Sequence, residues 1–214
     1  SSTSRGLGDV YKRQAPWRDC YRPNFFVNTP DINPYFLHHN GRAGFLIRAA
    51  LATMGSGLWG MYSGFEICES LPVPGKEEYL DSEKYEIRVR DYQAPGNIVA
   101  EIAQLNRIRR QNPALQTHLG FQAYPCWNDN ILFFGKRTAD RENFILVAVS
   151  LDPHNAQEAH FELPLWELGL DDHATTHGED LMTGHTWQWH GKTQWMRIEP
   201  WHQPFGIWRI RVAS

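Results

Sequence analysis

The first half of the chain alternates short apolar runs with apolar residues at helical spacing. Two short runs, at residues 24–27 and 58–62, predict buried strands because turn-forming residues bound them. Helical spacing at residues 44–54 and 98–109 predicts two helices, the second capped by Asn97. The order strand, helix, strand, helix is typical of α/β structure with a parallel sheet.

A long polar segment, residues 69–95, separates the second predicted strand from the second predicted helix. It is rich in Pro, Gly, Glu, Asp and Tyr and has no clear periodicity. Loops of this length inside a folded domain are usually either functional or disordered.

The pattern changes near residue 118 to short strands separated by turn residues. Several such strands in succession predict an all-β unit, an antiparallel β-sandwich. A hairpin is expected around Thr183-Gly184, where a polar turn joins two apolar stretches. The other expected strands cover residues 131–134, 144–149, 158–163 and 204–212.

The chain therefore divides into three parts, with a boundary expected at residues 112–118. Residues 1–14 show no periodicity, and their end, Asp9 to Gln14, resembles the translation of a sequencing adaptor. We interpret residues 1–14 as a non-native tail and exclude them from fold reasoning, although a native tail is the alternative. Residues 15–115 then form the α/β unit and residues 116–214 the sandwich.

Composition and charge exclude several classes of partner. The net charge of −3 and the pI near 6.3 do not favour nucleic acid or an anionic membrane surface. No apolar run is long enough for a membrane helix, and the N-terminus has no apolar signal core. The three cysteines form no CxxC motif or disulfide framework, which favours a reducing, cytoplasmic location.

Histidine placement gives no recognisable metal motif. The chain has 10 histidines but no HExxH sequence and no set paired with cysteines. His173 and His177 have i,i+4 spacing but flank Ala-Thr-Thr in a loop-like stretch. We therefore expect no metal site from this pattern.

Two carboxylates follow the predicted parallel strands. Asp31 ends an Asn-Thr-Pro-Asp turn, and Glu66 ends the Ser-Gly-Phe-Glu stretch after the second strand. Active sites of such sheets lie at the carboxyl ends of the strands, and glycosidic bond chemistry uses paired carboxylates. By spacing alone, however, Asp31 is more often a turn former and Glu66 more often a structural acceptor.

Four stretches in order then carry a family resemblance, from about Tyr21 to the end of the chain. The stretch FFVNTPDINP at residues 25–34 is similar to the fourth conserved region of the alpha-amylase superfamily. Within it, NTPD resembles the form found in alpha-1,4-glucan:maltose-1-phosphate maltosyltransferases. Residues 58–66 resemble that family's eighth barrel strand, residues 76–88 its following loop, and residues 102–113 its last barrel helix.

The resemblance implies a fold and a role for each matching residue. Residues 15–115 would be the last two strand–helix units of a (β/α)8 barrel, followed by the sandwich. Asp31 would be the transition-state-stabilising aspartate, with Lys84 and Tyr85 contacting the donor sugar. Apart from the resemblance, Asn28 is expected to orient the Asp31 loop by side-chain hydrogen bonding. Pro30 stands where most amylases have His, which agrees with the maltosyltransferase pattern and argues against a plain hydrolase.

The resemblance also implies an activity and its partners. The full-length enzyme would transfer maltosyl units from maltose 1-phosphate to an alpha-1,4-glucan with retention of configuration, without cofactor or metal, as a homodimer. The nucleophile and the acid/base residue would lie upstream of this chain, so that these residues alone would be inactive.

Two alternatives remain open. The first is a small alpha-glucan hydrolase that uses Asp31 and Glu66 as its carboxylate pair. Tyr62 and Phe65 are candidate pocket residues in either reading, although core packing is the favoured role for both. The second is a non-catalytic glucan-binding module. It would use the tryptophans of the C-terminal half, although core packing is the commoner role of such residues. The tryptophans considered are Trp166, Trp187, Trp189, Trp195, Trp201 and Trp208.

Overall fold

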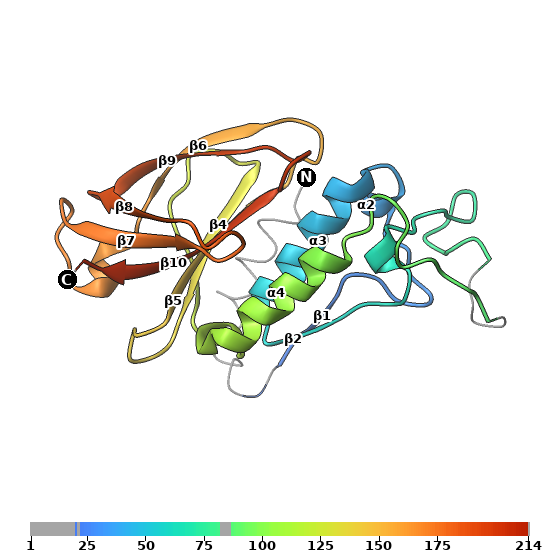
Figure 1. The fold of residues 1–214 in the computed structure, drawn as a ribbon, viewed down its shortest axis with the longest axis horizontal. Helices are drawn as coiled ribbons and strands as arrows, with labels where there is room; N and C mark the ends of the chain where they lie inside the picture. The colour runs from blue at the N-terminus through green and yellow to red at the C-terminus, as the bar shows by residue number, and fades with distance from the viewer. Residues whose placement is uncertain (1–19, 21, 82–86, 214) are drawn as a thin grey trace.

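The computed structural model describes residues 20, 22–81 and 87–213. The expectations for residues 1–14 and for Lys84 and Tyr85 fall outside this described part of the chain. Figure 1 shows two helices lying beside a β-rich unit, with a long irregular loop extending beyond the helices.

The first part has the predicted strand and helix order. Strand β1 (Asn24–Phe26) pairs in parallel with β2 (Leu58–Gly60), and Phe25 stands opposite Trp59. Between them lie the short helix α2 (Tyr35–His38) and the longer α3 (Gly41–Gly55). After β2 come the 3₁₀ turn η1 (Phe65–Ile67) and helix α4 (Val99–Gln111), which packs against α3.

The expected capping of α4 by Asn97 is wrong in detail, because the N-cap residue is Ile98 and it makes no side-chain cap hydrogen bond. Asn97 lies one residue earlier, where its Oδ1 accepts the Val99 N–H at 3.1 Å. The long segment before it has the irregular structure that its composition predicts. Its described residues contain no helix or strand, only an isolated bridge between Pro72 and Tyr79.

The second part is dominated by a six-stranded antiparallel sheet in the order β3-β4-β5-β10-β7-β8. A separate antiparallel pair, β6 and β9, completes it. The hairpin expected near Thr183-Gly184 is confirmed as the β7–β8 connection, with Gly184 at φ +78°. The bounds are η2 Pro113–Leu115, β3 Phe121–Ala123, β4 Ile131–Arg137, β5 Phe144–Ser150, β6 Gln157–Glu162, η3 Leu165–Leu168, β7 Thr175–Asp180, β8 Thr186–His190, β9 Thr193–Ile198 and β10 Phe205–Val212.

One local expectation is wrong: His177 lies in strand β7 rather than in a loop. The β7 sequence, TTHGED, has few apolar residues, but the strand pairs with β10 on one side and β8 on the other. Main-chain hydrogen bonds on both edges therefore override its weak apolar pattern.

The six-stranded sheet is covered on both faces. Side chains of Ile145, Val147 and Val149 on β5 join the cluster formed with α3 and α4. Leu146 and Ala148, on the opposite face of β5, join a second cluster with β6 and β9. A strand covered on both faces loses the alternation of a one-sided strand, and every residue of β5 is buried.

None of the helices in the described ranges is long and apolar enough to cross a membrane.

Candidate active-site edge

The carboxyl ends of β1 and β2 meet at one edge because the two strands are parallel and adjacent. The Val27 N–H extends this pairing by donating to the Gly60 carbonyl oxygen at 3.0 Å. Asp31, the first candidate carboxylate, follows β1, and Glu66, the second, follows β2. The structure therefore brings together the two strand ends that the sequence pattern singled out.

Asp31 lies at the tip of a tight turn and is exposed. Thr29 and Ile32 close this turn through reciprocal main-chain hydrogen bonds of 3.1 and 3.2 Å, and Thr29 Oγ1 accepts a further bond from the Ile32 N–H. Pro30 occupies the second turn position, where its fixed φ favours the bend. Downstream, Asn33 N–H donates to the Glu77 carbonyl oxygen at 2.8 Å, which attaches the turn to the long loop.

Asn28 connects three segments beneath this turn and is 2% exposed. Its Oδ1 accepts the Tyr62 N–H at 2.7 Å, which joins the end of β1 to the end of β2. Its Nδ2 donates to the Tyr79 hydroxyl at 2.6 Å, which adds the long loop. Burial raises the pKa of the Tyr79 phenol, so this hydroxyl stays neutral and can accept that bond. Asn28 therefore fixes the base of the Asp31 turn.

A partly buried ion-pair network lies beside this junction. Arg90 pairs with Glu69 at 3.0 Å, and Arg88 pairs with the other oxygen of the same carboxylate. The Arg90 guanidinium also lies 5.7 Å from the centre of the Tyr62 ring. These contacts attach the segment at residues 87–92 to the end of β2.

The backbone after β2 approaches this network closely at Gly64. Its φ is +102°, and an added Cβ would come within 2.4 Å of Glu69 Oε2. A glycine is therefore needed at this position for both conformation and space.

Glu66 makes a structural contact. Its Oε2 accepts the Gly64 N–H at 3.0 Å, and its main-chain oxygen accepts the Ile98 N–H at the start of α4. Phe65, the other residue considered for a pocket, is completely buried and packs on Phe45 at a ring distance of 4.9 Å. Both residues stabilise the η1 turn.

Tyr79, Glu69 and Arg90 contribute to this edge although the sequence reasoning gave them no role. Loop residues carry no periodic signal, so only their position in the long polar loop pointed to them. The two predicted donor contacts, Lys84 and Tyr85, belong to the same loop but lie outside the described residues.

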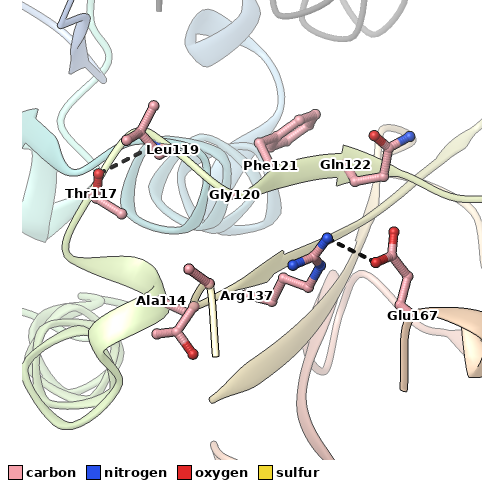
Figure 2. A pocket seen from close by; sticks show the side chains of 10 residues that line it. Ala114, Thr117, Leu119, Gly120, Phe121, Gln122, Arg137 and Glu167 are labelled. Atoms are coloured by element: carbon pink, nitrogen blue, oxygen red, sulfur yellow. Dashed lines mark hydrogen bonds and ion pairs between the residues drawn. The ribbon is translucent and has the colours of Figure 1, made fainter. Parts of the chain in front are cut away.

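A separate pocket of about 500 Å³ opens on the β-rich part, away from the Asp31 turn. Figure 2 shows the Arg137–Glu167 ion pair, 2.9 Å between the charged atoms, facing Gln122 across it. Its lining includes no residue of the β1–β2 edge. Within the described ranges, no group of three or more His, Cys, Asp or Glu side chains could hold a metal ion.

The tryptophans divide between core and surface. Trp187, Trp189 and Trp208 belong to the cluster between the sheet and β6–β9, which is the packing role that burial habits favour. Four tryptophans in the described ranges are more than half exposed, namely Trp127, Trp166, Trp195 and Trp201.

Comparison with known proteins identifies relatives of this sequence. Residues 123–210 match the family model described as GLGE, C-terminal. The chain is 81% identical, over 92% of its length, to the alpha-1,4-glucan:maltose-1-phosphate maltosyltransferase of Pseudomonas aeruginosa. It is 50% identical, over 90% of its length, to the protein of the same name from Cereibacter sphaeroides. It spans only 30% and 29% of these relatives' lengths.

Solved structures support the fold. The crystal structure of an alpha-amylase from Geobacillus thermoleovorans, complexed with acarbose, aligns with 98% of this chain at a TM-score of 0.72. The alignment covers 44% of that amylase at 14% sequence identity, so it bears on the fold alone. Taken with the sequence matches, the chain belongs to the family of the alpha-1,4-glucan:maltose-1-phosphate maltosyltransferases and corresponds to their C-terminal region.

Proposed function

We propose that the protein containing this chain is a retaining glycosyltransferase that moves maltosyl units from maltose 1-phosphate to the non-reducing end of alpha-1,4-glucans. The observation that carries the proposal is the exposed Asp31 at the carboxyl edge of β1, on a turn fixed by Asn28. The names of the relatives supply the donor and the acceptor.

In this proposal Asp31 stabilises the transition state. Its carboxylate accepts hydrogen bonds from hydroxyls of the distorted sugar and favours the positive charge that develops on the ring. These bonds strengthen as the charge develops, which is the condition for accelerating the reaction. Asn28, Lys84 and Tyr85 complete the sugar-binding edge. Retention of configuration results from two successive displacements at the reacting sugar carbon. A nucleophilic carboxylate and an acid/base carboxylate from outside these 214 residues carry out these displacements.

The same proposal assigns the domains. Residues 15–115 form the last two strand–helix units of a (β/α)8 barrel, residues 116–214 form a β-sandwich, and residues 1–14 are a non-native tail. The parallel β1–β2 pair and its attached helices support the barrel assignment. Two antiparallel layers that share one apolar cluster support the sandwich.

The proposed reaction requires no metal or cofactor, because phosphate is the leaving group and carboxylates supply the catalysis. Cys68 and Cys126 are free thiols, which supports the proposed cytoplasmic location. The proposed homodimer is tested by measuring the molar mass of the full-length protein in solution.

The second candidate is a hydrolase that uses Asp31 and Glu66 as its carboxylate pair. Glu66 already accepts a main-chain hydrogen bond within η1, which favours a structural role for it. A catalytic acid must instead be available to the departing oxygen.

Substitution in the full-length protein separates these candidates. We expect Asp31→Asn to lower kcat for maltosyl transfer roughly 100- to 1000-fold, because one transition-state contact is weakened. Glu66→Gln keeps an oxygen for the Gly64 N–H and should retain most of the activity. If Glu66→Gln abolishes transfer while Asp31→Asn does not, the assignment of Asp31 is wrong.

A further inference from the structure

A row of three exposed rings crosses the outer face of the β6–β9 pair. His160 of β6 stands opposite Trp195 of β9. On the other edge of β6, the Trp127 N–H donates to the His160 carbonyl oxygen at 3.0 Å, next to the Cys126–Phe161 bridge. Side chains alternate between the faces of a strand, so Trp127, His160 and Trp195 share one face, opposite the buried Phe161. We call these three residues the outer ring row.

The outer ring row faces away from the rest of the described chain. Trp127 is 60% and Trp195 54% exposed, and His160 is also exposed. The inner face of the pair packs against the six-stranded sheet through Phe161, Ala159 and Met196. Figure 1 shows β6 and β9 as an outlying layer, on the far side of the β-rich unit from α4. The two indoles therefore form a surface feature.

The separation and setting of the indoles match an extended ligand. Two strand spacings place the main chains of Trp127 and Trp195 about 10 Å apart, with His160 between them. Beside the row, Glu158 forms an ion pair with Arg197 on the same face. On the other side Lys192 lies near Glu162, and it pairs more closely with Asp172. Each side of the row therefore carries both positive and negative side chains, which favours an uncharged ligand over a polyanion.

We propose that the outer ring row binds an alpha-1,4-glucan chain away from the active site. The choice of an alpha-1,4-glucan as the ligand rests on the proposed function. The C–H face of a glucose ring packs on an indole face. The hydroxyls at the edge of the glucose ring form hydrogen bonds with His160 and with the charged side chains beside the row. Two indoles at this spacing contact separate sugars of one chain. This site would hold a long acceptor while its end is extended.

The test measures glycogen binding by the full-length protein without donor. The variant Trp127→Ala/Trp195→Ala should bind glycogen about tenfold more weakly, because two stacking contacts are lost. Trp201→Ala is the matched control, since Trp201 is 63% exposed but lies in the turn before β10. We expect this control to bind within about twofold of the parent. Thermal melting of each variant shows whether it is folded, and Trp→Phe changes at both positions should restore part of the affinity.

Equal glycogen affinity for the double variant and the parent would overturn this inference. So would an equal loss in the Trp201→Ala control. A double variant that keeps its affinity but changes its molar mass in solution would assign the face to contact between protein copies instead. Maltosyl transfer by the unsubstituted protein is assayed separately, so that failure of the proposed function is distinguished from failure of this site.

Discussion

At the scale of single residues, Asn28 has the largest structural role at the candidate site. Its amide satisfies a main-chain N–H at 2.7 Å and a phenol at 2.6 Å, both beneath the exposed carboxylate. Removing one partner from a buried hydrogen bond costs more than the bond itself contributes, because the other group is left unpaired.

We therefore expect Asn28→Ala to lower the free energy of unfolding by about 2–3 kcal/mol. It should also lower transfer activity by misplacing the Asp31 turn. Asn130→Ala is a matched control at an exposed position and should change stability by less than about 0.5 kcal/mol. Urea denaturation of both variants checks this. A similar small effect at Asn28 would show that the turn does not depend on its amide.

Lys136 of β4 is a fully buried cation. Its Nζ donates to the Thr117 carbonyl oxygen. Burial, together with the charge of Arg109, lowers the pKa of Lys136 from 10.5 to about 7. The unfolded chain retains this proton up to about pH 10.5, whereas the folded chain releases it near pH 7. The unfolded state therefore binds more protons between these values, so this group makes stability rise with pH across that window.

The variant Lys136→Met should remove this pH dependence. Between pH 7 and 8.5 the free energy of unfolding of the parent should rise relative to the variant, by at most about 1.4 kcal/mol per pH unit. Burial raises the pKa of Cys68 to about 11, but this thiol is present in both proteins and cancels from the difference. Denaturation at several pH values checks this, and parallel profiles would contradict it.

At the scale of elements, the turn after β2 depends on a glycine for two separable reasons. Gly64→Ala should lower the free energy of unfolding by roughly 2–4 kcal/mol, because the positive φ is strained for alanine and the new Cβ meets Glu69 Oε2. Gly96 has φ +82° with nothing within 4 Å of an added Cβ, so Gly96→Ala should cost only about 1 kcal/mol. Denaturant midpoints of the two variants give the difference between their free energies of unfolding. Equal losses of stability in Gly64→Ala and Gly96→Ala would exclude a steric role for Glu69.

The elements that the sequence predicted best are those with strong apolar patterns. Helix α3 and strand β5 are buried along most of their length, and the first three residues of β10 are buried, so their apolar residues are unmistakable. Short or polar strands were missed because their stability comes from pairing rather than from their own side chains. Strand β3 has three residues and depends on β4, and polar β7 depends on two neighbours.

Residues of the candidate site could be predicted from the sequence only where they lie in such a pattern. Asp31 and Asn28 could be identified because they follow a recognisable strand in a recognisable motif. Tyr79 and Glu69 contact the site from a loop whose path depends on tertiary hydrogen bonds, and no local pattern encodes that path.

At the scale of the whole molecule, the two halves of the chain share one core. Ile102 and Leu105 of α4 belong to the same apolar cluster as Val147 of β5 and Ile207 of β10. The Gln104 side chain also donates to the Leu181 carbonyl oxygen at 2.9 Å. The β-rich part is therefore attached firmly to the helices that support the candidate catalytic edge.

Incubation of the full-length protein with maltose 1-phosphate and a short alpha-1,4-glucan measures the proposed transfer itself. We expect phosphate to be released in step with glucans that lengthen by two glucose units, and we expect Asp31→Asn to slow both together. Release of phosphate with free maltose as the main product, or no elongation at all, would contradict a maltosyltransferase function.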